Sequence, residues 1–140
     1  MRVVWRRLPA GGFDHELVWL AVSMAALTGG ALWLWIGLLW PQCPFLAMTG
    51  WPCLTCGATR ATIAFVHGNF LEAFSWNPLA FLALCGVAVF DLYAAVVLLG
   101  RRPRLRVVDW TRTEKNIARA VVVCALLVNW IYLLMHRGRF

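Results

Sequence analysis

The run LVWLAVSMAALTGGALWLWIGLLW, residues 17–40, contains no charged side chain. A helix rises about 1.5 Å per residue, so about 20 apolar residues cross the hydrocarbon core of a bilayer. The run is longer than the roughly 7–15 apolar residues of a signal peptide, and no small-residue cleavage site closes it. We therefore expect a transmembrane helix that is retained in the protein.

Two further apolar runs, at about 78–99 and 117–135, are also long enough to span. Hydrophobic residues make up 62% of the 140-residue chain and charged residues 14%, which a soluble domain of this size could not accommodate. We predict an all-α integral membrane protein, one membrane domain over 1–140, with three transmembrane helices in the lipid bilayer. No soluble basic module is left over for binding nucleic acid.

The distribution of positive charge predicts the orientation of the chain. Ten of the 13 lysines and arginines lie in residues 1–16 and 100–119, which three spans place on the same side. The positive-inside rule puts that side in the cytoplasm. We expect residues 100–116 to form a basic cytoplasmic loop, and residues 41–57 to lie on the outer face of a bacterial inner membrane.

Residues 41–57, PQCPFLAMTGWPCLTCG, gather three of the five cysteines. Three prolines and two glycines in this stretch argue against a regular helix, so we expect a loop. The following residues, 58–74, predict one short helix that lies on the membrane surface or re-enters it. Chemistry is most plausible at Cys43, Cys53 and Cys56, since cysteines inside apolar spans are usually small hydrophobic residues.

Three interpretations of this cysteine motif are open. A C-x-x-C turn followed by glycine is typical of a zinc or iron site, with Cys43 as a third ligand. His67 is a poor fourth ligand, because a continuous helix would place it about 16 Å along the axis from Cys56. Alternatively, Cys53 and Cys56 perform thiol–disulfide chemistry, with Arg60 stabilising a thiolate. In the third interpretation, a disulfide from Cys43 staples the loop.

Polar residues near the motif and within the spans are further candidates. Thr59 and Arg60 at a helix start, with His67, are supporting residues that could hold a phosphate or a lipid headgroup. Asp91 lies inside the second span, where a carboxylate is a functional candidate by default. We expect it to be protonated or hydrogen-bonded to Asn129, which we place at similar depth on the third span.

The spacing of the motif residues also resembles a family. C-P, T-G, C-x-x-C-G, T-R-A, H-G and N-P occur in that order between Cys43 and Pro78. This pattern resembles small membrane proteins catalogued as domain of unknown function 2752, although Leu54 stands where the family usually has proline. The resemblance implies a multi-span bacterial membrane protein and no particular activity.

These observations favour a non-catalytic accessory protein or subunit of a membrane assembly, with a protein partner in the membrane and a cysteine motif that organises an outer-face site. The alternative is a thiol- or metal-dependent protein centred on Cys53 and Cys56. The sequence contains no Ser–His–Asp set, phosphate loop or paired carboxylates, so catalytic residues are unknown and the question of an enzyme stays open.

Overall fold

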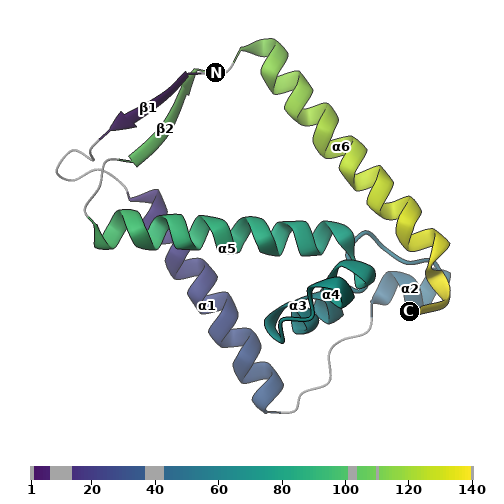
Figure 1. Ribbon diagram of the computed structural model, residues 1–140. Coiled ribbons are helices and arrows are strands. Elements are labelled where there is room, and N and C mark those ends of the chain that lie inside the picture. The colour runs from purple at the N-terminus through teal and green to yellow at the C-terminus, as the bar shows by residue number, and fades with distance from the viewer. Residues whose placement is uncertain (1, 7–13, 37–42, 101–103, 110, 140) are drawn as a thin grey trace. The chain divides into compact units, whose positions relative to one another are not determined.

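The computed structural model describes residues 2–6, 14–36, 43–100, 104–109 and 111–139. Three of its helices are long and apolar enough to cross a membrane: α1 (His15–Trp35), α5 (Pro78–Leu99) and α6 (Arg112–Met135) (Figure 1). Only 6–11% of the residues in their apolar windows are buried within the chain, so lipid must cover the rest. The predicted fold class, an all-α membrane protein with three spans, is confirmed.

The chain forms two compact units, each built from two segments of sequence. One comprises Met1–Leu39 and Val87–Lys115, and the other comprises Trp40–Gly86 and Asn116–Phe140. Helices α5 and α6 each run from one unit into the other. The expectation of a single membrane domain stays a prediction.

The first unit contains a strand pair that the sequence analysis did not anticipate. Strand β1 (Arg2–Arg6) pairs antiparallel with β2 (Arg104–Asp109), so that Arg6 lies opposite Arg104. Each segment contains a pair of valines, a residue type that is enriched in strands. The pairing joins the N-terminal segment to the second connector.

Helix α1 begins where Asp14 caps it, with the Asp14 carboxylate accepting from the Leu17 N–H at 3.1 Å. The helix ends at Trp35, and the last residues of the predicted span, 37–40, lie outside the described residues.

The second unit contains a short helix where the sequence predicted only a loop. Helix α2 spans Pro44–Thr49 and ends at Gly50, whose φ of 71° lies in the left-handed region. Proline is compatible with the first turn of a helix, because the N–H that it lacks would have no partner there. The prediction that proline and glycine exclude a helix from this stretch was therefore wrong for its first half.

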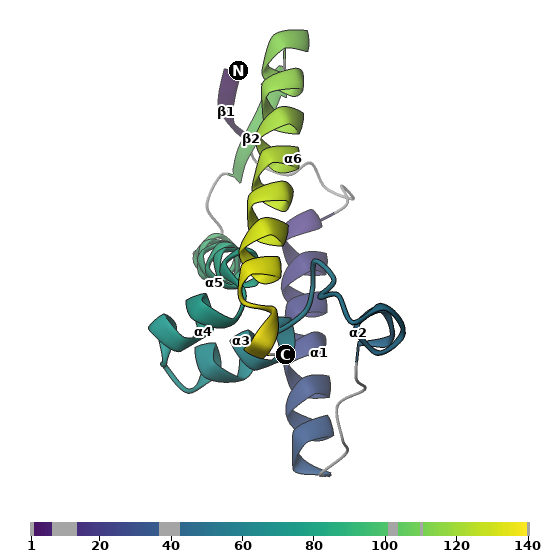
Figure 2. The same ribbon diagram turned by 90° about the vertical axis from the view of Figure 1, so that its right-hand side faces the viewer.

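The predicted helix over 58–74 is in fact a helical hairpin. Helix α3 (Ala58–Val66) ends at His67, Gly68 takes a left-handed φ of 78°, and α4 (Phe70–Trp76) returns beside it (Figure 2). The Gly68 N–H donates to the Phe65 carbonyl at 3.0 Å, which closes the end of α3. Small buried alanines let the two helices approach, namely Ala61, Ala64 and Ala73.

Four phenylalanines pack the hairpin against the start of α5. The ring of Phe81 lies 5.7–6.5 Å from those of Phe65, Phe70 and Phe74, in edge-to-face arrangements that aromatic pairs prefer. The hairpin and the first turns of α5 therefore share one core.

Candidate metal and thiol site

The three cysteines of the motif converge on one point. The Cys53 sulfur lies 3.2 Å from that of Cys43 and 3.3 Å from that of Cys56, and all three sulfurs lie within 4.8 Å of one another. Cys43 is the residue before α2, whereas Cys53 and Cys56 flank a turn closed by the Cys56 N–H donating to the Cys53 carbonyl at 3.1 Å. Gly57 follows the turn with a φ of 78° and leads into α3.

The cysteines are free thiols in the structure. Disulfide sulfurs lie about 2.05 Å apart, well short of the separations seen here. The disulfide staple predicted from the sequence is therefore not supported. The sulfurs would still need only a small displacement to bond.

The sulfur arrangement fits one soft metal ion. Zinc–sulfur bonds of about 2.3 Å in a tetrahedron imply sulfur–sulfur distances of about 3.8 Å. Two of the distances here, 3.2 and 3.3 Å, are somewhat shorter, and all lie below 4.8 Å. Among the residues that the structure describes, no histidine or carboxylate joins the group. His67 is not part of it. A site built from these residues has three protein ligands and an open fourth position.

The two cysteines of the turn have opposite acid–base behaviour. Burial raises the pKa of Cys53, but hydrogen bonds with Thr55, Cys43 and Cys56 outweigh it and lower the pKa from 9.0 to about 7. Burial, followed by the hydrogen bond with Cys53, raises the pKa of Cys56 to about 12. Of the two cysteines, Cys53 therefore ionises near neutral pH, whereas Cys56, only 5% exposed, stays a thiol there.

Side chains from distant elements hold the backbone of this loop. The buried Asn77 amide donates to the carbonyls of Leu54 at 3.2 Å and Cys56 at 3.0 Å, while its oxygen caps α5 at the Ala80 N–H. From α6, the Asn129 amide donates to the same Leu54 carbonyl at 3.3 Å. Loop carbonyls that lack regular backbone partners are thus satisfied.

Trp130 also holds the loop, because its ring N–H donates to the Pro52 carbonyl at 3.2 Å. We call Asn77, Asn129 and Trp130 the frame of the cysteine loop. The sequence analysis missed the role of Trp130. The contact joins residues that are 78 positions apart in the sequence, which leaves no local pattern. The sequence signal for this role was the position of Trp130, directly after Asn129 near the end of the third span.

Of the two expectations for Asp91, protonation or a hydrogen bond with Asn129, the second is contradicted, because Asn129 bonds Leu79 and Leu54 instead. The protonation of Asp91 stays a prediction. The Asn129 oxygen accepts the Leu79 N–H at 3.0 Å, in the first turn of α5, whereas Asp91 lies about 18 Å further along the same helix. Asn129 therefore contacts the cysteine loop rather than Asp91. Within the described residues, Oδ1 of Asp91 is the buried side-chain oxygen that accepts no hydrogen bond.

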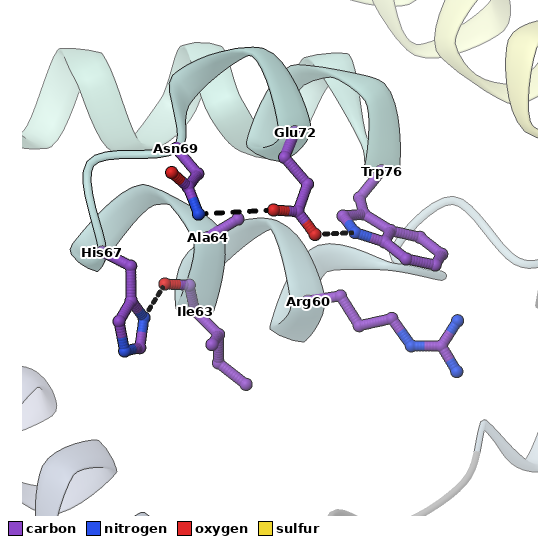
Figure 3. A pocket seen from close by; sticks show the side chains of 7 residues that line it. All are labelled: Arg60, Ile63, Ala64, His67, Asn69, Glu72 and Trp76. Carbon is purple, nitrogen blue, oxygen red and sulfur yellow. Dashed lines mark hydrogen bonds between the residues drawn. The ribbon is translucent and has the colours of Figure 1, made fainter.

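The other predicted supporting residues lie on α3. Thr59 is half-buried in its first turn. The exposed Arg60 places its guanidinium 4.6 Å from the centre of the Trp76 ring and donates to the Arg139 carbonyl at 3.0 Å. Nδ1 of His67 lies 2.8 Å from the Ile63 carbonyl oxygen. Arg60 and His67 line a pocket between α3 and α4 rather than joining the sulfur group (Figure 3).

Residues 43–90 match the family described as protein of unknown function (DUF2752). The resemblance drawn from the motif is thereby confirmed. The DUF2752 segment begins at Cys43, includes the hairpin and ends within α5. No curated protein and no solved structure matches the chain.

Proposed function

We propose that the protein is a non-catalytic membrane subunit in which Cys43, Cys53 and Cys56 bind one zinc or iron ion on the outer face. The convergence of three sulfurs within 4.8 Å carries this proposal. Thiolates are preferred ligands of zinc and of iron in proteins. A bound ion would tie the start of α2 to the turn before α3, and so organise the outer surface for a partner.

The frame around the site favours metal binding. Asn77, Asn129 and Trp130 hold the loop carbonyls without any contribution from a metal. A loop held in this way loses less conformational entropy when an ion binds. The open fourth position leaves room for a water molecule or a side chain of a partner protein.

The outer-face location rests on two independent observations. The positive-inside rule places the basic segments in the cytoplasm. The pairing of β1 with β2 joins residues 2–6 to residues 104–109, which agrees with both segments lying on one side of the membrane. The cysteine loop, which lies one span away from each, then faces the outside of a bacterial inner membrane.

A second candidate function is thiol–disulfide exchange. Its support is the contrast between Cys53, with a pKa of about 7, and the buried Cys56, with a pKa of about 12, across 3.3 Å. A reactive thiolate beside a protected resolving thiol suits such exchange. Both candidate functions use the same sulfurs. In the first they bind a metal ion, and in the second they form and break a disulfide.

Metal analysis of the detergent-purified chain distinguishes the candidates. We expect about one zinc or iron per chain by mass spectrometry, lost on replacement of Cys43, Cys53 or Cys56 by serine. Cys85→Ser and Cys124→Ser serve as matched controls, since neither residue joins the sulfur group. A metal-free protein with a Cys53–Cys56 disulfide in peptide maps would replace the metal proposal with the exchange function. A metal-free protein with five free thiols would refute both.

A further inference from the structure

A pocket of about 240 Å³ lies between α3 and α4, apart from the sulfur group. Figure 3 shows its walls, with the Glu72 carboxylate between Asn69 and Trp76, Arg60 beneath the Trp76 ring, and His67 at the other end. The pocket is smaller than the roughly 300–1,000 Å³ of sites for drug-sized ligands. Its size suits a small polar group.

The pocket presents a cation and an anion to the same space. The Glu72 oxygens lie 3.4 Å from the Trp76 ring nitrogen and 3.5 Å from the Asn69 amide nitrogen, both long for hydrogen bonds to a carboxylate. Arg60 carries five N–H donors, of which the contact with the Arg139 carbonyl uses one. Within the described residues, no ion pair joins Arg60 to Glu72, so both charges can meet a ligand.

The position of the pocket in the chain sets its depth in the membrane. Helix α4 ends at Trp76 and the α5 span begins at Pro78, so the hairpin lies at the level where a span enters the bilayer. The hairpin exposes large apolar side chains, with Leu71 89% exposed and Val66 68% exposed. Apolar side chains on a surface helix of this kind insert at the boundary between headgroups and acyl chains.

We infer that this pocket binds the headgroup of an aminophospholipid, with the phosphate on Arg60 and the primary ammonium on Glu72. A zwitterion satisfies both charges, whereas a purely anionic headgroup would face the Glu72 carboxylate. A quaternary ammonium could lie over the Trp76 ring but has no N–H to donate to Glu72. The pocket therefore favours phosphatidylethanolamine over phosphatidylglycerol and phosphatidylcholine.

Lipid titration of the full chain in detergent, followed by native mass spectrometry, tests this inference. We expect phosphatidylethanolamine to bind about tenfold more tightly than phosphatidylcholine or phosphatidylglycerol, the scale of one charge-assisted hydrogen bond. The comparison uses the unaltered chain, so it does not depend on the folding of a variant. Equal binding of the three lipids would overturn the inference.

Variants assign the preference to the pocket. Glu72→Gln should remove the preference for phosphatidylethanolamine over phosphatidylcholine, and Arg60→Gln should weaken binding of both. Arg119→Gln, an exposed arginine on α6, should change neither. Gel filtration reports whether each variant folds. An undiminished preference in folded Glu72→Gln would place the lipid elsewhere, and tighter binding of soluble phosphoethanolamine than of the lipid would overturn the membrane ligand.

Discussion

Asn77→Asp is the sharpest single test of the frame around the sulfur site. The substitution preserves side-chain volume and the oxygen that caps α5 at the Ala80 N–H. It replaces the amide that donates to the carbonyls of Leu54 and Cys56, at 3.2 and 3.0 Å, with a second oxygen. The two donated hydrogen bonds are lost, and an ionisable carboxyl group then faces two carbonyl oxygens in a buried position, which adds to the cost.

The cost follows from burial. Asn77 is 1% exposed, so water cannot replace the lost donors. Two hydrogen bonds at about 1 kcal/mol each, with at least one buried acceptor left unsatisfied, give a loss of about 3 kcal/mol in the free energy of unfolding. That loss corresponds to a change of about a hundredfold in the folding equilibrium.

Equilibrium unfolding in mixed micelles of SDS and a nonionic detergent measures this loss. Asn116→Asp is the matched control, since Asn116 is exposed on α6 and the same change there should alter stability by less than about 0.5 kcal/mol. We also expect Asn77→Asp to lose most of its bound metal, because the turn that carries Cys53 and Cys56 is no longer held. Equal stability of the two variants would refute the role of Asn77 as the support of this loop.

Three further perturbations test other parts of the structure. In metal-free protein, the alkylation rate of Cys53 should reach half its maximum near pH 7, which is its pKa, whereas Cys56 should stay unreactive until strongly alkaline pH. Site-resolved mass spectrometry measures both rates. Identical pH profiles for the two cysteines would contradict the assignment. Gly68→Ala should lower the free energy of unfolding by about 1 kcal/mol because of its φ of 78° alone, since a Cβ there meets no atom within 4 Å. Gly138→Ala is the control, because a Cβ at Gly138 also meets no atom within 4 Å. Trp130→Phe should lose about 1 kcal/mol with its hydrogen bond to Pro52, whereas Trp19→Phe on the exposed surface of α1 should not, and equal thermal stability of the two would remove Trp130 from the frame.

The spans could be predicted because hydrophobicity and length act locally. The second span, 78–99, has the predicted bounds, since Pro78 starts the helix and Gly100 follows it. The hairpin was missed because its break depends on a single residue, Gly68, whose left-handed conformation the sequence permits but does not demand. Glycine within a helical pattern is tolerated often enough that the break is ambiguous from sequence.

The candidate site could likewise be predicted only where its residues lie close together in the sequence. Cys43, Cys53 and Cys56 could be singled out because they lie within one short stretch, and the turn between the last two has a recognisable spacing. The frame could not, because Asn129 reaches Leu54 across 75 residues and a buried asparagine in a span has several possible partners. From the sequence, Asp91 was considered as a partner of Asn129, because both are polar residues within predicted spans. The relative depth of residues on two helices cannot be obtained from the sequence of either helix alone.

The Leu54 carbonyl receives hydrogen bonds from both Asn77, at the start of α5, and Asn129, near the end of α6. One acceptor atom between two cysteines is therefore shared by two spans. A displacement of α6 by a few tenths of an ångström at Asn129 would lengthen a 3.3 Å bond beyond useful range, and the turn that carries the sulfurs would relax. By linkage, the ion proposed for this site would resist that displacement if it fixes the turn. The position of α6 at Asn129 and the order of the cysteine turn are thus coupled through a single carbonyl oxygen.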